Sequence, residues 1–223
     1  MGVSALLVVF LISLYGTGIS LAGSVTGRRQ MVRNAEVSVV LNFLLITVAS
    51  TALWIAFSRR DFSLLYVFEH SSRSLPGIYN ITAFWVGQAG SLLFWTWLLS
   101  AFTLLTVRQS RFSAPDLNPW IIFVLMVNSS FFLLLLNFVS NPFSPFPGPV
   151  PIDGNGLNPL LQSPWMFIHP PMLFTGYAGL MITFAFAMAS LLAGRKDPLW
   201  IKMSRSWTVA SWFFLGAGIL LGA

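Results

Sequence analysis

The sequence predicts an all-α, polytopic membrane protein: a bundle of about six transmembrane helices with both chain ends on the outer side. Of its 223 residues, 56% are hydrophobic and only 8% are charged, a composition typical of a chain that lies in lipid. Long stretches carry no charge at all, and most exceed the roughly 20 residues that a spanning helix needs. Lysine and arginine are also distributed unevenly between alternate loops, as in membrane proteins of defined orientation.

Six spans fit these apolar stretches, and the fifth is long enough to tilt or kink. The expected spans are Gly2–Gly23, Glu36–Phe57, Gly90–Val107, Asn118–Val139, Trp165–Ala193 and Trp207–Ala223. The first span lacks both the basic start and the small-residue cleavage site of a secretory signal. We therefore expect it to be retained as a helix.

The basic residues predict the orientation, because positively charged loops stay in the cytoplasm. Nine follow the first, third and fifth spans: Arg28, Arg29, Arg33, Arg108, Arg111, Arg195, Lys196, Lys202 and Arg205. The other side has three: Arg59, Arg60 and Arg73. Both termini are therefore expected outside. The basic excess reports topology, and nothing in the chain indicates a nucleic-acid partner.

The chain is expected to have three parts. Residues 1–139 form a four-span bundle with an outward segment at 61–89, which is too long for a turn and too apolar for a disordered linker. Gly87 and Gly90 there indicate close backbone packing. Residues 140–164 form an outward loop whose seven prolines favour order without helix or strand. Residues 165–223 hold the fifth span and a truncated sixth.

Few side chains can carry chemistry. The chain has no cysteine, which excludes disulfides, thiolate metal ligands and a covalent haem attachment motif in this chain. It has two histidines and six acidic residues, and the acids lie mostly at the ends of spans or in loops. The sequence therefore contains no intramembrane carboxylate chain of the kind that relays protons.

His169 is the principal candidate because Pro170 and Pro171 follow it where the proline-rich loop meets the fifth span. Proline disfavours helical geometry in the preceding residue and is tolerated in the first helical turn, so His169 is predicted at the mouth of a membrane helix. A neutral imidazole there can bind a metal, above all haem iron. It can equally cap the helix by a hydrogen bond to a neighbouring carbonyl. For His70, pairing with an acid such as Glu69 is the preferred interpretation.

Two further residue types could contact a cofactor. The tryptophans Trp85, Trp95, Trp97 and Trp165 could pack on a porphyrin, although interface anchoring also explains aromatic residues at helix ends. Arg73 could pair with a haem propionate, since a guanidinium suits a planar carboxylate, or it could extend to a lipid phosphate.

Several motifs resemble one family. They are NPF at 141–143, DGNGLNPLLQ at 153–162 and HPPMLFTGYAG at 169–179, together with EHSSRSLPGIYNITAFW and GSLLFWTW within 66–97 and WFFLGAGILLG at 212–222. This set is similar to the CcmF and NrfE type of haem-handling membrane protein in cytochrome c maturation. The resemblance covers nearly the whole chain, and its HPPML and LNPLLQ elements are its most specific parts.

The resemblance implies a membrane subunit of a cytochrome c haem lyase, which binds haem b (iron-protoporphyrin IX) and transfers it to apocytochrome c at the outer face. The implied partners are a haem chaperone, apocytochrome c and a thiol-reducing subunit that presents the apocytochrome. His169 matches the first of two histidines that ligate the outward-facing haem. Trp165 and Arg73 are the further cofactor-binding candidates.

Two departures from the family pattern matter. Val86, Gly87, Gln88 and Ala89 stand where many relatives have Gly-Gly-His-Glu. The sequence also stops before the tryptophan-rich domain and before the second haem ligand, so the active site is incomplete in this chain and the C-terminal portion of the same family protein is an expected partner. A fragment and a naturally split subunit both remain open.

Other functions also remain open at this point. The proline-broken fifth span could belong to a transporter or channel subunit, and the outer loops could belong to a structural docking subunit without haem ligation. The bacterial inner membrane is the expected location, with the mitochondrial inner membrane as the alternative.

Overall fold

The computed structural model describes residues 2–222, and its regular secondary structure there is helical apart from one isolated bridge between Leu64 and Pro145. The α-helices are α1 (Gly2–Thr26), α2 (Arg29–Arg59), α3 (Leu65–His70), α4 (Tyr79–Val86), α5 (Gln88–Ser113), α6 (Asn118–Phe138), α7 (His169–Leu192) and α8 (Leu199–Gly222). Two short 3-10 helices, η1 (Pro159–Leu161) and η2 (Pro164–Phe167), lie in the long loop before α7. The predicted all-α class is confirmed.

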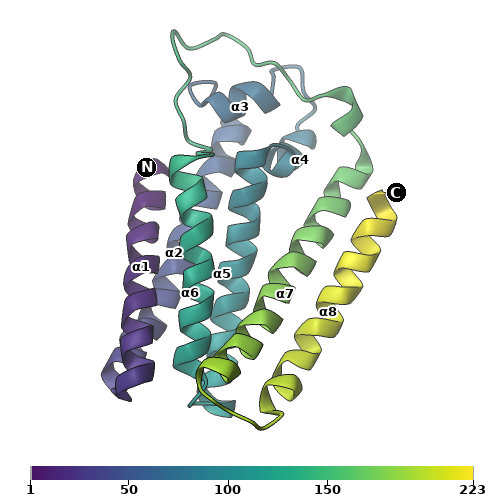
Figure 1. Ribbon diagram of the computed structural model, residues 1–223. Helices are drawn as coiled ribbons and strands as arrows, with labels where there is room; N and C mark the ends of the chain where they lie inside the picture. The colour runs from purple at the N-terminus through teal and green to yellow at the C-terminus, as the bar shows by residue number, and fades with distance from the viewer. Residues whose placement is uncertain (1, 223) are drawn as a thin grey trace.

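Four long helices form the main bundle: α1 packs on α2 and α6, and α5 packs on α2 and α6. Helix α7 leans against α5 and α6, and α8 packs chiefly on α7. Figure 1 shows the resulting shape, with the α7–α8 hairpin beside the bundle. Helices α3 and α4 and the loop of residues 139–168 cover one end, here called the cap end. The start of α1 and the end of α8 both point toward it.

Five segments are long and apolar enough to cross a membrane: α1, α2, α5, α6 and Pro164–Leu192, which joins η2 to α7. Their mean hydropathies lie between 1.6 and 2.3. The expected sixth span corresponds to the later part of α8, which is not among the five, and Ala223 lies outside the described residues. Helix α8 carries Lys202 and Arg205 in its first two turns and several tryptophans and serines after them, which lowers its hydropathy.

Several helices extend beyond the expected spans. Helix α2 begins at Arg29 rather than Glu36, and α8 begins at Leu199 rather than Trp207. Charged residues continue a helix into water, so hydropathy marks the apolar part of a helix and not its ends. The start of the fifth span also differs: Trp165 lies in a 3-10 turn, and α7 begins at His169 because two prolines occupy its first turn.

The interior is mostly apolar, with a small polar seam. One buried cluster joins α1, α2 and α5 to the cap, and a second joins α5, α6 and α7. Between α2 and α6, Ser129 donates to Asn42 (3.2 Å), and between α1 and α6, Ser130 donates to Ser13 (2.9 Å). Such hydrogen bonds satisfy polar groups that lipid cannot solvate.

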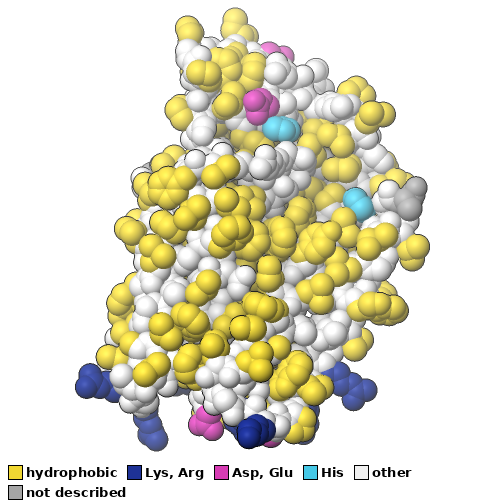
Figure 2. Space-filling model, viewed as in Figure 1, with side chains coloured by type: hydrophobic (Ala, Val, Ile, Leu, Met, Phe, Trp, Pro, Cys, Tyr) yellow, Lys and Arg dark blue, Asp and Glu magenta, His cyan; other side chains and the backbone are white. Residues whose placement is uncertain are grey.

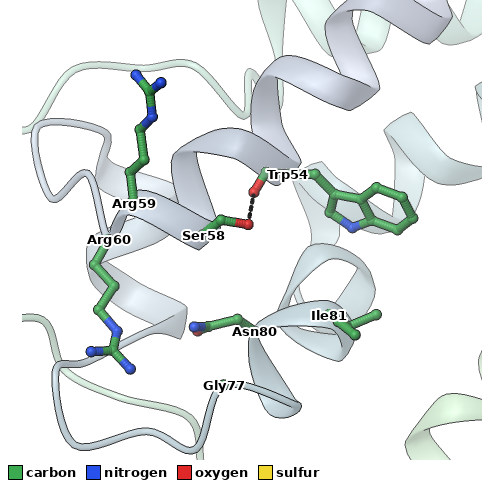
Figure 3. Close-up of a pocket in the computed structure, with 7 residues that line it drawn as sticks. All are labelled: Trp54, Ser58, Arg59, Arg60, Gly77, Asn80 and Ile81. Carbon is green, nitrogen blue, oxygen red and sulfur yellow. Dashed lines mark hydrogen bonds between the residues drawn. The ribbon is translucent and has the colours of Figure 1, made fainter.

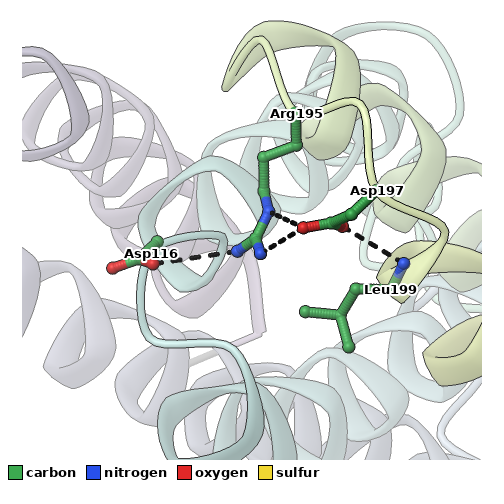
Figure 4. A network of polar contacts seen from close by, with 4 residues as sticks. All are labelled: Asp116, Arg195, Asp197 and Leu199. Atoms are coloured by element: carbon green, nitrogen blue, oxygen red, sulfur yellow. Dashed lines mark hydrogen bonds and ion pairs between the residues drawn. The ribbon is translucent and has the colours of Figure 1, made fainter.

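The end opposite the cap carries nine of the twelve basic residues. On the face drawn in Figure 2, lysine and arginine gather at that end, and both histidines lie toward the cap. Figure 4 shows how two of its loops are joined: Arg195 pairs with Asp197 in its own loop and with Asp116 in the α5–α6 loop, at 3.7 Å. The Arg195 guanidinium and the Leu199 N–H lower the pKa of Asp197. The α5–α6 and α7–α8 loops are thereby held together.

Candidate functional site

His169 is the first residue of α7, at the cap end of the α7–α8 hairpin. Its Nδ1 lies 2.7 Å from the carbonyl oxygen of Gly218, near the end of α8. A carbonyl oxygen only accepts hydrogen bonds, so Nδ1 carries the hydrogen. In the neutral ring the lone pair is then on Nε2, for which no partner occurs within residues 2–222. His169 is half-buried, and Gly222 lies beside its ring.

The predicted capping role and the predicted ligand role are therefore compatible. The carbonyl that fixes the imidazole is not a neighbouring one, since Gly218 lies 49 residues further along the chain. Orientation of one nitrogen by a carbonyl is the arrangement by which proteins hold metal-binding imidazoles. The local expectation from sequence is corrected on this point, because only the packing of α8 on α7 brings the two groups together.

Glycines make that packing possible. A Cβ at Gly222 would collide with the His169 ring, and a Cβ at Gly218 would lie 2.8 Å from Leu173 Cδ2. Gly176 of α7 is in turn covered by Leu215 of α8. Small residues on both helices let the two backbones approach closely, as is common between membrane helices. We call this row of contacts the glycine seam.

Trp165 lies in η2, four residues before His169, and its side chain is 57% exposed. The turn is anchored from the α4 side: the indole Nε1 of Trp85 donates to the carbonyl of Met166 at 3.0 Å. Ile168 N–H also donates to the carbonyl of Trp165 at 3.1 Å. Trp165 thus presents an exposed ring from a fixed backbone close to His169 in the chain.

Arg73 lies on the loop between α3 and α4 and is exposed. Its backbone N–H donates to Asp153 Oδ1 at 2.7 Å, and Gly154 N–H donates to the same oxygen at 2.8 Å. These two hydrogen bonds, the first being the larger cause, lower the pKa of Asp153. In the described part of the chain, no hydrogen bond or ion pair links Arg73 to His169 or Trp165, so the structure does not join all three candidates.

His70 is half-buried in the cap, and the expectation that it pairs with an acid is wrong. Its Nδ1 lies 2.9 Å from the carbonyl of Tyr66, one turn earlier in α3, and the two rings are 4.4 Å apart between centroids. The Tyr66 hydroxyl accepts from Gly87 N–H at 3.0 Å and donates to Phe84 O at 3.1 Å. Burial raises the pKa of Tyr66 well above its usual range.

The close packing predicted at Gly87 and Gly90 is confirmed. A Cβ at Gly87 would press on His70 and Tyr66, and one at Gly90 would meet the carbonyl oxygen of Phe84 and the hydroxyl of Tyr66. The cap therefore closes on the break between α4 and α5 without room for a side chain. Gln88, the first residue of α5, is exposed beside this break.

An aromatic group between α5 and α7 was not predicted. Trp95 of α5 lies 5.3 Å from Tyr177 and 6.0 Å from Phe174, both of α7, between ring centroids. Trp95 and Trp97 are therefore packed between helices rather than in an interfacial belt; Trp97 Nε1 donates to Thr47 Oγ1 at 3.1 Å. The spacing of Phe174 and Tyr177 on one face of the fifth span was the available signal.

These residues fit one axial position of a haem and no more. A cavity of about 200 Å³, lined in part by Gln88, Trp95 and Phe174, lies at the cap-end side of α5, α6 and α7, and it is far too small for a macrocycle. Within residues 2–222, no group of three or more histidine, cysteine or acidic side chains is placed to bind a metal. In the described part of the chain, His169 Nε2 therefore offers one nitrogen for a metal, without a group of further ligands beside it.

The chain is similar to known proteins of one family. The family model described as "Cytochrome C assembly protein" matches residues 85–223. The chain is 40% identical over 223 residues to "Cytochrome c-type biogenesis protein CcmF" of Pseudomonas aeruginosa, covering all of this chain and 34% of that protein. It is 37% identical over 193 residues to "Probable cytochrome c-type biogenesis protein NrfE" of Escherichia coli, covering 86% of this chain and 35% of that protein.

A solved structure also matches. The structure named "Cytochrome c Heme Lyase CcmF" superposes with a TM-score of 0.81 at 28% sequence identity, and the match covers 98% of this chain and 34% of that one. The chain therefore spans about one third of the length of the relatives that it matches. The helical arrangement, including the α7–α8 hairpin, is that of the matching part.

Proposed function

Because this chain belongs to the cytochrome c assembly protein family, we propose that it forms the His169-bearing part of a cytochrome c haem lyase of the CcmF and NrfE type. It is an integral membrane protein, and we place it in the bacterial inner membrane. The observation that carries the proposal is the His169 imidazole, whose Nδ1 is fixed by Gly218 and whose Nε2 has no hydrogen-bond partner within residues 2–222.

In this proposal His169 Nε2 would bind the iron of haem b at the cap end. The Gly218 carbonyl keeps the imidazole in the tautomer that leaves this nitrogen unprotonated. The exposed indole of Trp165 would pack on the macrocycle, and the Arg73 guanidinium at the same end would pair with a propionate. Bound haem supplies the vinyl groups to which apocytochrome thiols add, and these residues contribute position rather than proton transfer.

We also propose that the cap end faces the outer compartment. The nine basic residues at the opposite end support this, because they mark the cytoplasmic side. In this orientation the four-helix part (1–139) forms the membrane bundle. The outward loop (140–164) forms a docking surface, and the α7–α8 part (165–223) carries His169. The haem chaperone, the thiol-reducing subunit and apocytochrome c would approach from the cap end.

A second axial ligand must come from outside this chain, and we assign it to the C-terminal portion of the same family protein. Helix α8 supports this assignment because it packs chiefly on α7 and exposes Trp212 and Leu220. The single ligand predicts that the 223-residue polypeptide alone retains haem weakly or not at all.

The test is the haem content of membranes in which this chain is co-expressed with the C-terminal portion of a CcmF relative. His169→Ala should remove the outer haem, whereas His70→Ala should retain it, because His70 faces the cap interior. Added imidazole should restore haem to His169→Gly by occupying the vacated position. Equal haem in His169→Ala and the unmodified complex would overturn the ligand role.

A further inference from the structure

A second recess lies on the bundle at the outer end of α2, formed by α2 and the start of α4. It has a volume of about 770 Å³ and is lined by Trp54, Ser58, Arg59, Arg60, Gly77, Asn80 and Ile81. Figure 3 shows the two arginines on one side and the apolar side chains of Trp54 and Ile81 on the other. The volume lies in the range of small-molecule sites. Neither His169 nor His70 lines it.

The lining of this recess carries positive charge. No acidic residue is among its lining residues, and neither Arg59 nor Arg60 forms an ion pair in the described part of the chain. Two carboxylates lie nearby: Asp61 lines the neighbouring pocket together with Arg59, and Arg60 is close enough to Asp153 to act on its charge. A lining that holds guanidiniums and no carboxylate favours an anion.

Arg60 is held in place by its backbone. It ends α2 in the left-handed region, with φ 53° and ψ 50°, and its N–H donates to Phe57 O at 3.1 Å. Its Nη2 donates to the carbonyl of Leu75 at 2.9 Å, which fixes the guanidinium against the loop after α3. A non-glycine residue in this region is disfavoured by about 1–2 kcal/mol, so the surrounding contacts keep the arginine at the recess against a local cost.

Asn80 adds a third donor. Its Oδ1 accepts from Ser71 Oγ at 2.8 Å, which leaves the amide nitrogen to donate. In Figure 3 its side chain lies on the same side as that of Arg60, whereas the Arg59 side chain extends in the opposite direction. Ser58 Oγ donates to the carbonyl of Trp54 at 2.9 Å and does not compete for the same ligand. The polar side of the recess therefore offers Arg60 and Asn80 as donors, with Arg59 at its edge.

The other side of the recess is apolar and faces the lipid-exposed surface of the span. Trp54 and Ile81 are each 47% exposed, and Trp54 precedes Arg59 by a little more than one turn of α2. A tryptophan below arginines at the end of a spanning helix is the arrangement of the membrane interface. The ligand that matches both sides has an anionic head and a hydrocarbon chain.

We propose that this recess binds an anionic phospholipid, with the phosphate held by Arg60 and Asn80, a further positive charge from Arg59 at the edge, and an acyl chain along Trp54 and Ile81. Inorganic phosphate would use the donors and not the apolar wall. Haem would lack an iron ligand here, because no histidine, methionine or cysteine lines the recess. The bound lipid ties the end of α2 to α4, and so supports the cap.

The experiment is native mass spectrometry of the purified, delipidated full chain titrated with phosphatidylglycerol, phosphatidylcholine, inorganic phosphate or haem. Phosphatidylglycerol should bind in preference to phosphatidylcholine. Arg59→Gln combined with Arg60→Gln should weaken it roughly a hundredfold, since each hydrogen bond to a charged group changes affinity about tenfold. Arg73→Gln, at the same end but outside the recess, should leave this affinity unchanged.

Further variants separate lipid from other anions. Trp54→Leu should weaken the binding of phosphatidylglycerol and leave any binding of inorganic phosphate unaltered. Arg60→Gly removes the guanidinium while keeping a residue that favours the left-handed backbone. The proposal is overturned if the double variant binds phosphatidylglycerol as well as the unmodified chain, if Arg73→Gln loses as much, or if phosphate or haem displaces the lipid at equal concentration.

Discussion

The chain's two histidines are fixed by the same kind of hydrogen bond and are used differently. In both, Nδ1 lies within 3 Å of a backbone carbonyl. For His70 that carbonyl belongs to Tyr66, one turn earlier in the same helix, and the ring is stacked on Tyr66 beneath Gly87. For His169 it belongs to Gly218 on another helix, and the ring sits at the end of a hairpin.

The difference lies in what surrounds each ring. Both histidines are half-buried, and each Nε2 has a glycine beside it: a Cβ at Gly87 would lie 2.5 Å from Nε2 of His70, and one at Gly222 would lie 2.9 Å from Nε2 of His169. The His70 ring is stacked on Tyr66 within the cap, whereas His169 begins α7 at the end of the α7–α8 hairpin. A hydrogen bond to one nitrogen fixes the tautomer of an imidazole, but access to the other nitrogen decides whether it can bind a metal.

The largest expected effect comes from disrupting the packing around Tyr66 and His70. Gly90→Val places a branched side chain against the Phe84 carbonyl and the Tyr66 hydroxyl, and backbone cannot move aside as a flexible side chain can. We expect about 3 kcal/mol or more of destabilisation, measured by thermal unfolding in detergent. Gly216→Ala is the matched control, since nothing lies within 4 Å of its added Cβ. Equal melting temperatures for the two variants would refute the tight packing.

The next largest effect comes from disrupting the contact between His169 and α8. Gly222→Ala puts a methyl group into the His169 ring and should displace Nδ1 from the Gly218 carbonyl. Loss of such an orienting contact lowers metal affinity about 10- to 100-fold, so the haem content of the completed complex should fall while its melting temperature changes little. Gly194→Ala is unsuitable as a control because of its positive φ, and Gly216→Ala on the same helix serves instead.

A smaller effect sharpens the comparison through pH. Tyr66→Phe leaves the Gly87 N–H and the Phe84 carbonyl without their partner and should cost about 1–3 kcal/mol. Burial raises the pKa of Tyr66, so its contribution is fully present below the ordinary tyrosine value of about 10 and is lost as pH rises above it. The free energy of unfolding of the unmodified chain, measured with denaturant, should therefore fall above about pH 10. Tyr66→Phe should not show this fall.

The smallest effect concerns the loop that crosses the cap. The pKa of Asp153 is lowered by the backbone N–H groups of Arg73 and Gly154, so its contribution is present above about pH 4, the ordinary value, and is lost as pH falls. Asp153→Asn keeps an accepting oxygen and should change the stability of the chain little at pH 7. The protection factor of the Arg73 N–H, which is the intrinsic exchange rate divided by the observed rate at the same pH, should fall in acid in the unmodified chain only; a protection factor that does not change with pH would contradict the assignment.

Sequence reasoning found the helical class and the position of His169 because both follow from local rules. Apolar stretches of sufficient length predict spans, and a histidine before two prolines predicts a helix start. It misjudged the start of α2 at Arg29, because charged turns continue a helix beyond its apolar part, and it assigned Trp95 to an interfacial belt although the residue packs between α5 and α7.

Contacts between distant segments were beyond those rules. Gly218 and His169 are 49 residues apart, and the tautomer of the imidazole depends on their meeting. His70 was paired with Glu69 because they are adjacent in sequence, whereas the helix turns its ring toward Tyr66. The recess at Arg59 and Arg60 was likewise hidden, since the loop after α3 and the start of α4 complete it.

Because of the glycine seam, the contacts of the His169 ring depend on the rotation of α8 relative to α7. Adding one residue to the α7–α8 turn would rotate α8 by about 100° and carry Gly218 and Gly222 away from the imidazole together. The ring would then lose its acceptor and meet a bulkier side chain in the same step. The contacts that hold α8 against α7 therefore determine which nitrogen of the His169 imidazole carries the hydrogen.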